Sequence, residues 1–179
     1  ENYIDISFDT IVAYGKNGAN PHHENDDSRL NPGDSIIIDM GCKYQGYCSD
    51  MTRTIFVGDV PEEMKKVYEL VLKNQEQVLQ DMRDGANTKQ ISKMVDNDFR
   101  LHNFDLIHAL GHGVGLDIHE GPVLSINSEH TLKEKMIVTD EPGIYIPGQF
   151  GVRIEDTVQI FKGSCEPLTK SPKKIIVIK

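Results

Sequence analysis

The sequence predicts an α+β domain in which helices lie outside a mostly antiparallel sheet. Three observations favour this fold class: early stretches rich in β-branched and aromatic residues, two middle segments with helical periodicity, and later strand-like stretches separated by Gly, Pro and Asn-Ser turns. The order of strands, two helices and strands is typical of α+β proteins. With 179 residues, 38% of them hydrophobic and 26% charged, the chain is expected to form one globular domain.

The strands before the helices are expected at residues 10–14, 35–41 and 47–57. The second and third form a predicted β-hairpin. With a loop over residues 43–46, Asp39 lies directly across from Asp50, with Cβ atoms roughly 5 Å apart on one face. Two facing carboxylates repel unless a proton or a cation lies between them, and a hard divalent cation prefers oxygen ligands. The hairpin therefore predicts a metal site.

The first helix is expected to start at Pro61 and to end near Gly85. Pro suits the first helical position, and Glu62 and Glu63 complement the helix dipole. The apolar residues with helical spacing are Met64, Val67, Tyr68, Val71, Val78 and Met82. A second, shorter helix is expected to carry Ile91, Met94, Val95 and Phe99 on one face. Strands then return at residues 104–110, 136–141, 150–161 and 174–178.

Further candidate metal ligands lie in three later segments. His112 is on a glycine-rich loop, Glu141 is at a strand end, and Glu155 is inside a strand. Alternation within that strand puts Arg153 and Glu155 on one face and Asp156 on the other. The proposed set is one histidine and four carboxylates: His112, Asp39, Asp50, Glu141 and Glu155. Four negative charges balance two divalent cations, a combination that activates a hydroxide for hydrolysis.

Six ordered blocks of this sequence resemble the pita-bread metallopeptidases, most closely the Xaa-Pro branch formed by aminopeptidase P and Xaa-Pro dipeptidase. The blocks cover residues 17–23, 39–41, 49–54, 111–120, 141–145 and 153–156. Each block alone is weak, but together they span almost the whole chain in the family's order. The resemblance implies a creatinase/aminopeptidase-like fold, in which a curved sheet has two pseudo-symmetric halves, each with a helix pair outside.

Only one helix pair is predicted here, so residues 1–179 are expected to be a single catalytic domain that is partial at its N-terminus. An uncovered sheet face would be apolar, and apolar patches usually find a partner. We therefore expect either a homodimer or dependence on a missing N-terminal segment.

The resemblance also implies the roles of the site residues. The matches to Asp50 and Glu155 bridge two metal ions, the match to Asp39 chelates one, and those to His112 and Glu141 bind the other. A metal-bridging hydroxide is then the nucleophile, and Glu141 also carries its proton toward the leaving nitrogen. Manganese is the expected metal, although oxygen-rich ligation suits cobalt, zinc or iron as well.

Four more residues are expected at the site. His119 stabilises the oxyanion, His22 contacts the substrate nitrogen at the scissile bond, and the family position of His108 lines the substrate pocket. Arg153 shares a strand face with Glu155, so its guanidinium fork is expected to orient a ligand carboxylate such as Asp39.

The favoured function is a metal-dependent exopeptidase that hydrolyses the Xaa-Pro bond at the N-terminus of peptides or in dipeptides. A methionine aminopeptidase is the alternative within the enzyme class, which a panel of Xaa-Pro and Met-Ala peptides would separate. The alternative from another class is a non-catalytic peptide-binding module or inactive fragment of the same fold. Such relatives usually lose ligands, whereas all five are present here.

Composition narrows the partners and the location. The net charge of −9 and the scattered lysines argue against nucleic-acid binding. No apolar run approaches the roughly 20 residues of a membrane span, and the N-terminus lacks a signal-peptide pattern. Three cysteines without paired spacing suit reduced thiols. A cytoplasmic peptidase that does not bind a membrane is therefore expected.

Overall fold

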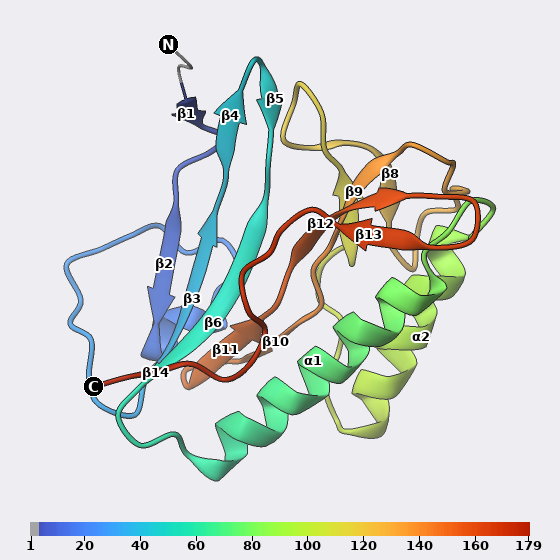
Figure 1. Ribbon diagram of the computed structural model, residues 1–179. Coiled ribbons are helices and arrows are strands. Elements are labelled where there is room, and N and C mark those ends of the chain that lie inside the picture. Colours follow the sequence, from blue (N-terminus) through green and yellow to red (C-terminus); the bar gives the residue numbers. More distant parts are fainter. Residues whose placement is uncertain (1–3) are drawn as a thin grey trace.

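The computed structural model describes residues 4–179 and has strands, then two helices, then strands (Figure 1). The elements before the helices are β1 (Ile4–Ile6), β2 (Ile11–Tyr14), the 3-10 helix η1 (Gly15–Ala19), β3 (Ser35–Met40), β4 (Cys42–Tyr44), β5 (Tyr47–Cys48) and β6 (Met51–Val57). The helices are α1 (Glu62–Asp81) and α2 (Thr88–Leu101). The later strands are β7 (Gly111–Gly113), β8 (Glu120–Leu124), β9 (Ile137–Asp140), β10 (Gly143–Ile146), β11 (Phe150–Arg153), β12 (Asp156–Ile160), β13 (Cys165–Pro167) and β14 (Val177–Ile178). The predicted α+β class is confirmed.

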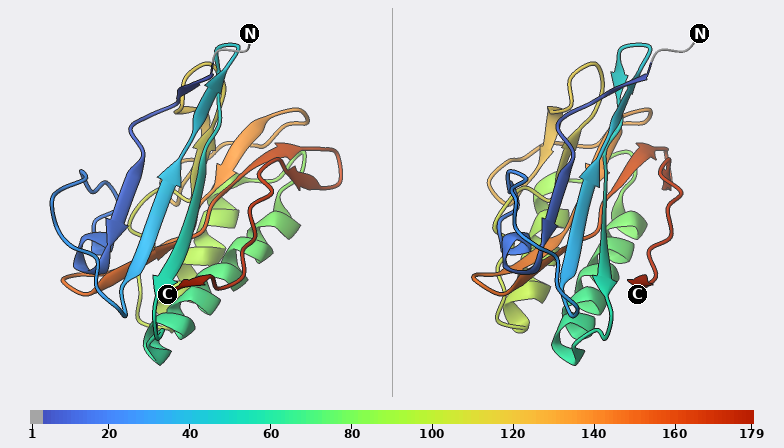
Figure 2. Two further views of the ribbon diagram at one scale, coloured as in Figure 1. Left: turned by 60° about the vertical axis from the view of Figure 1, so that its left-hand side comes forward. Right: turned by 90° about the vertical axis from the view of Figure 1, so that its left-hand side faces the viewer.

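Hydrogen bonding divides these strands into four groups. Their orders are β14-β6-β3-β2, β13-β12-β9-β7-β8, β1-β4-β5 and β10-β11. The pairs are antiparallel except β14 with β6. Helices α1 and α2 pack against each other, and α1 also contacts β9, β10, β11 and β13 (Figure 2). The helix pair thus covers the strands of the second half of the chain.

The hydrophobic core lies between this helix pair and the strands. Helix α1 buries the predicted residues Val67, Tyr68, Val71 and Val78, and α2 buries Ile91, Val95 and Phe99. Asn87 caps α2 because its side chain accepts a hydrogen bond from the backbone N–H of Gln90. Among the described residues, no helix is both long enough and apolar enough to cross a membrane.

The predicted hairpin exists, but its register differs by two residues. Asp39 pairs with Thr52 rather than Asp50. The loop has two residues, because Gln45 (φ 50°) and Gly46 (φ 87°) both adopt positive φ, as tight hairpin turns require. A shift of two residues preserves the faces, so Asp39 and Asp50 are diagonal neighbours on the same face.

The same hairpin has an interruption that the predicted continuous strand 47–57 did not include. Residues 49 and 50 lie between β5 and β6. A Cβ on Gly41 would lie 2.0 Å from the carbonyl oxygen of Ser49, so only glycine allows this close approach. The interruption places Asp50 at a strand boundary.

Three other predicted strands are corrected. Residues 104–110 form no strand. Of their backbone groups, only those of Leu110 form hydrogen bonds with the later strand segments, and β7 begins at Gly111. The predicted strand 150–161 divides into β11 and β12 after Arg153, since the N–H of Glu155 turns to donate to the carbonyl of Thr52. The predicted strand 174–178 is reduced to Val177–Ile178.

Candidate metal centre

One cavity of about 640 Å³ is lined by every residue predicted for the site. The candidate metal ligands are Asp39, Asp50, His112, Glu141 and Glu155, and the other predicted residues are His22, His108, His119 and Arg153. The ligands come from segments up to 116 residues apart, from Asp39 to Glu155, so the fold is what brings them together.

Three of the five candidate ligands lie at strand boundaries. Asp50 directly precedes β6, Glu141 directly follows β9, and Glu155 lies in the break between β11 and β12. Asp39 and His112 are within β3 and β7. At a strand boundary, a side chain need not follow the alternating directions of the strand, while its neighbours stay fixed by the sheet. Residues from separate sheets can therefore direct their side chains toward the same place.

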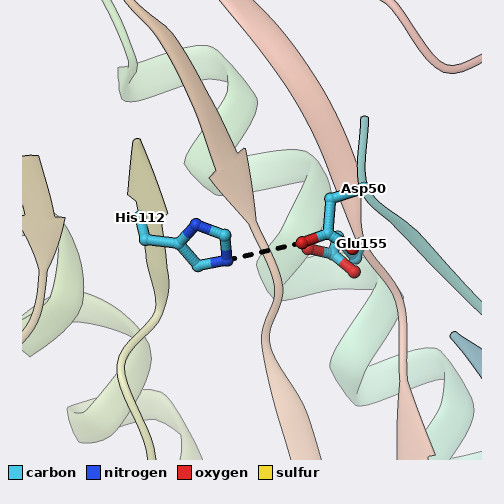
Figure 3. Close-up of side chains that lie close together, drawn as sticks. All are labelled: Asp50, His112 and Glu155. Carbon is cyan, nitrogen blue, oxygen red and sulfur yellow. Dashed lines mark ion pairs between the residues drawn. The ribbon is translucent and has the colours of Figure 1, made fainter. Parts of the chain in front are cut away.

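Three of the carboxylates, those of Asp50, Glu141 and Glu155, lie close to His112, while Asp39 lines the same cavity. Its Nε2 lies 3.5 Å from Oδ2 of Asp50 and 3.5 Å from Oε1 of Glu141. Ligand atoms of Asp50, His112 and Glu155 all lie within 4.8 Å of one another (Figure 3). The Nδ1 of His112 is 3.0 Å from the carbonyl oxygen of Gly113, which can only accept, so Nδ1 carries the hydrogen. Burial lowers the pKa of His112, but the hydrogen bond with Asp50 and the charge of Glu141 outweigh burial and raise it. Nε2 can bind a cation once it has lost its proton.

Backbone contacts hold His112 in this position. Its N–H donates to Oγ1 of Thr139 over 3.0 Å, and that hydroxyl donates to Oε1 of Glu141 over 3.4 Å. A Cβ on Gly111 would lie 2.2 Å from the carbonyl oxygen of Thr139, so glycine is needed for β7 to approach β9 this closely. Thr139 therefore joins the two candidate ligands.

Three of the carboxylates, those of Glu141, Glu155 and Asp39, are buried close to other negative groups, and their pKa values are raised. Burial raises the pKa of Glu141 from 4.5 to about 7. Burial, with Glu141, Asp50 and Asp39, raises the pKa of Glu155 well above its ordinary value. Burial also raises the pKa of Asp39 despite the nearby Arg153. Such a cluster has excess negative charge that a divalent cation would neutralise.

Two unpartnered oxygen atoms support the same conclusion. Among the described residues, Oδ1 of Asp39 and Oδ1 of Asp50 are buried and accept no hydrogen bond. An unsatisfied buried carboxylate oxygen is costly, and coordination to a cation removes that cost. The donor set of four carboxylates and one imidazole fits divalent metal ions.

Arg153 and Thr52 orient the candidate ligands. Arg153 donates from Nη2 to Oδ2 of Asp39 over 2.7 Å and from Nε to Oγ1 of Thr52 over 3.1 Å. Thr52 in turn donates from Oγ1 to Oε2 of Glu155 over 2.7 Å. The expected contact of Arg153 with Asp39 is present, but through one nitrogen instead of a bidentate fork. The rest of the guanidinium holds other groups.

The next contact along this chain of hydrogen bonds is Tyr145. Its hydroxyl accepts from Nη1 of Arg153 over 2.9 Å and lies 2.9 Å from Nε2 of His108. Burial lowers the pKa of His108 to about 4, so this ring is neutral at neutral pH. Since Nδ1 of His108 donates to the carbonyl of Ala109, its Nε2 accepts from Tyr145. His108 is thus fixed in one tautomer at the cavity wall.

His119 and His22 lie on other walls of the cavity. The ring of His119 packs edge-on against that of His112, with centroids 4.4 Å apart. Burial and the neighbouring His112 lower the pKa of His119. His22 borders both this cavity and a second one lined by residues 9–11 and 22–25. Neither ring forms part of the three-residue cluster of Asp50, His112 and Glu155.

Sequence reasoning missed Thr52, Thr139 and Tyr145. Thr52 lies two residues after Asp50, and therefore on the same strand face, so alternation was a usable signal. Tyr145 is within a family block, but its role depends on the pairing of β10 with β11, which places it near Arg153. Thr139 had no signal beyond its place two residues before Glu141.

Comparisons with known proteins agree with this arrangement. The sequence pattern of metallopeptidase family M24 matches residues 1–162. The chain is 43% identical over 172 residues to the Xaa-Pro dipeptidase of Pyrococcus horikoshii, which covers 95% of this chain and 49% of that protein. The chain therefore spans about half the length of the curated relatives it matches.

Solved structures are similar over nearly the whole chain. The X-Pro aminopeptidase from Thermotoga maritima matches with a TM-score of 0.93 and 39% identity, over 97% of this chain and 50% of that one. The Xaa-Pro dipeptidase from Bacillus anthracis matches with a TM-score of 0.94 and 39% identity, again over 97% of this chain and 50% of that one. These similarities identify the architecture as the expected pita-bread fold.

Proposed function

Because the chain belongs to metallopeptidase family M24, we propose that it carries the metal centre of an exopeptidase that hydrolyses Xaa-Pro bonds. The observation that carries this proposal is the meeting of five oxygen and nitrogen donors, from five separate segments, around one cavity. The named relatives support the choice of bond, since they include Xaa-Pro dipeptidases and an X-Pro aminopeptidase. No observation favours a methionine aminopeptidase or a non-catalytic module.

We propose that Asp39, Asp50, His112, Glu141 and Glu155 together hold two divalent ions. Asp50 and Glu155 would be shared by the two ions, Asp39 would hold one, and His112 and Glu141 would hold the other. Four carboxylates balance the charge of two such ions, and manganese suits their oxygen-rich character. When bound, a two-metal centre polarises the scissile carbonyl and lowers the pKa of water.

The protein's own groups would perform the proton transfers. Glu141 accepts the proton of the attacking water and delivers it to the leaving nitrogen, which its raised pKa and its place beside His112 both support. Delivery to this nitrogen is essential for a proline substrate, because the released imino nitrogen must leave as a neutral amine.

The histidines outside the metal set would bind the substrate. His119, packed against His112, donates to the oxyanion that develops on the scissile carbonyl. His22 contacts the substrate at the scissile nitrogen. His108 cannot gain a proton at neutral pH, so it lines the pocket as a neutral ring suited to an apolar proline side chain.

The experiment that tests this function is a peptide panel assayed with the chain after loading with Mn²⁺. The panel contains Xaa-Pro dipeptides, Xaa-Pro-Xaa tripeptides and matched Met-Ala peptides, and it is repeated with metal-free protein and with Glu141→Gln. We expect cleavage of Xaa-Pro peptides by the loaded wild type alone. The ratio of dipeptide to tripeptide turnover separates a dipeptidase from an aminopeptidase. Preferential cleavage of Met-Ala peptides would overturn the assignment.

A further inference from the structure

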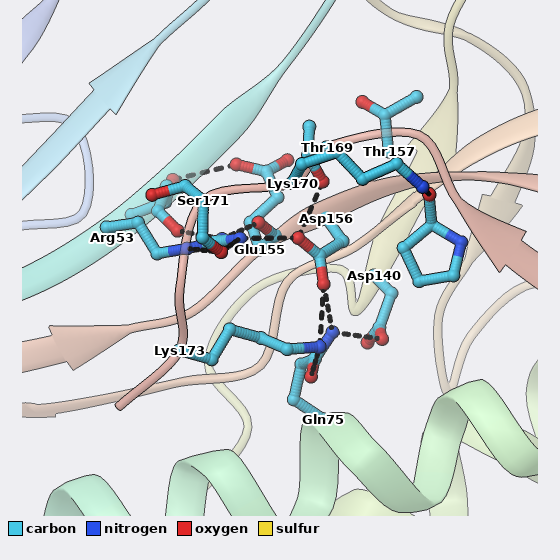
Figure 4. A network of polar contacts seen from close by, with 12 residues as sticks. Arg53, Gln75, Asp140, Glu155, Asp156, Thr157, Thr169, Lys170, Ser171 and Lys173 are labelled. Carbon is cyan, nitrogen blue, oxygen red and sulfur yellow. Dashed lines mark hydrogen bonds and ion pairs between the residues drawn. The ribbon is translucent and has the colours of Figure 1, made fainter. Parts of the chain in front are cut away.

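A buried ionic network lies next to the metal centre, at β9 and β12, the strands adjacent to Glu141 and Glu155 (Figure 4). Its central residues are Asp140 and Asp156, which are paired across β9 and β12. Asp140 directly precedes Glu141, and Asp156 directly follows Glu155. Because side chains alternate along a strand, these aspartates point away from the cavity while the glutamates line it.

The C-terminal segment, residues 169–173, supplies one cation of this network. Lys173 donates from Nζ to Oδ2 of Asp156 over 2.8 Å and to Oε1 of Gln75 over 2.8 Å. The side-chain nitrogen of Gln75, on α1, donates to Oδ2 of Asp140 over 3.0 Å and to Oδ2 of Asp156 over 3.1 Å. Thr169 donates to the other oxygen of Asp156 over 2.6 Å. Lys173 therefore joins the C-terminal segment to α1 and to β12, and Gln75 joins α1 to both β9 and β12.

Arg53 extends the network to the backbone of the metal centre. It donates from Nη2 to Oδ1 of Asp156 over 2.7 Å and to the carbonyl of Ser171 over 2.8 Å. Its Nη1 donates to the carbonyl of Thr52 over 2.9 Å and also to the carbonyl of Glu155. Thr52 and Glu155 are the residues that meet where the break between β11 and β12 approaches β6.

We propose that Lys173 is a positioning residue for the metal centre, which it stabilises through Asp156 and Arg53. The break before β12 leaves Glu155 outside any strand, so its backbone depends on the bonds to Thr52 and Arg53. Arg53 is in turn held by Asp156, and Asp156 by Lys173 and Thr169. Removal of the Lys173 ammonium group would take one hydrogen-bond partner from Asp156 and one from Gln75. The support that Asp156 and Arg53 give to the backbone of Glu155 would then be weaker.

This inference deepens the proposed function, because it assigns a residue that tunes the same centre. Residues that orient metal ligands typically contribute about 10- to 100-fold to metal affinity or activity. Nothing in the sequence pattern singles out Lys173, which is one of several lysines near the end of the chain.

The test compares Lys173→Met with Lys173→Arg and with the matched control Lys170→Met in the full chain. Lys170 is in the same segment but is exposed, and among the residues that the structure describes it pairs only with Glu166 and the carbonyl of Pro167. Two readouts are used: Mn²⁺ affinity by calorimetry, and amide hydrogen exchange of residues 139–142 and 153–157 without metal. The exchange readout does not depend on metal binding.

We expect Lys173→Met to weaken Mn²⁺ affinity about 10-fold or more and to speed exchange in both segments. Lys173→Arg should restore most of both, and Lys170→Met should match wild type. A folded Lys173→Met protein with wild-type affinity and exchange would overturn the inference. If Lys173→Met does not fold, Thr169→Val removes one bond to Asp156 and must show the same two changes, or the inference is wrong.

The two proposals fail in different ways. Wild-type protein that binds no Mn²⁺ contradicts the proposed metal centre, and the exchange data then decide alone whether Lys173 fixes these segments. If wild type and Lys173→Met both bind Mn²⁺ with equal affinity, only the role of Lys173 is contradicted.

Discussion

Nη2 of Arg153 lies 2.7 Å from Oδ2 of Asp39, although the two residues are 114 positions apart in the chain. The same guanidinium also donates to Thr52 and to Tyr145. Arg153 therefore contacts the candidate ligand Asp39 directly and reaches Glu155 through Thr52. Through Tyr145 it also reaches the cavity wall. Lysine, with one compact ammonium group, cannot replace this planar set of donors.

Arg153→Lys is therefore expected to weaken metal binding about 10- to 100-fold while the protein remains folded. Calorimetric titration with Mn²⁺ measures the affinity, and Arg29→Lys, at an exposed position, serves as the control. Affinity equal to wild type would show that the position of Asp39 does not depend on Arg153.

Glu141→Gln is expected to reduce kcat by at least about 100-fold, because it removes a proton carrier and a negative charge from the centre. His22→Ala and His119→Ala should reduce turnover while metal content stays near that of wild type. Metal analysis beside a kinetic assay checks both expectations. Loss of metal from the two histidine variants would show that they are ligands and not substrate contacts.

The stability of metal-free protein should depend on pH through Glu141. Its pKa rises from 4.5 to about 7 on folding, so the folded state binds this proton more tightly than the unfolded state. The contribution to the free energy of unfolding is fully present below about pH 4.5 and is lost as pH rises through about 7. Denaturation in the presence of a chelator, with wild type compared to Glu141→Gln, isolates this group.

As pH rises from 4.5 to about 7, wild type should therefore lose stability relative to Glu141→Gln. Above about pH 7 the difference between the two proteins should stay constant. Added Mn²⁺ should stabilise wild type more at higher pH, because ligands bind metal in their deprotonated form. A difference that is independent of pH would contradict the raised pKa.

Self-association is expected because one face of the β14-β6-β3-β2 sheet carries apolar residues, and within residues 4–179 no helix pair packs over it. The register places Val12 and Ile38 on this face, and alternation along β6 adds Ile55, whereas Arg53 on the same face is buried against Asp156 and Ser171. Ile178, at the edge of the same sheet, is 40% exposed. Sedimentation at several concentrations measures the association. A stable monomer with full peptidase activity would show that this face needs no cover.

The sequence predicted the helices and the residues of the site better than it predicted the strand pairing. Helix α1 and the buried face of α2 follow from local periodicity, which is fixed within a few residues, although α1 begins at Glu62 rather than Pro61 and ends at Asp81 rather than near Gly85. The hairpin register depended on Gln45, whose positive φ has no local signal because glutamine rarely adopts it.

The breaks at residues 49–50 and 154–155 also lacked a local signal. Both result from contacts between distant segments, namely Gly41 with Ser49 and Glu155 with Thr52. Asp39 and Asp50 stayed on one face because an error of two residues preserves strand alternation. The cavity could therefore be anticipated from the sequence, whereas the network from Arg153 to Tyr145 could not.

Anomalous diffraction from crystals soaked in Mn²⁺ tests the central claim most directly. The account predicts two anomalous peaks in the cavity, roughly 3.5–4 Å apart, each within about 2.0–2.4 Å of donor atoms. Asp50 and Glu155 should contact both ions, Asp39 one, and His112 and Glu141 the other. Peaks elsewhere on the protein, or peaks in the cavity that these residues do not contact, would contradict it.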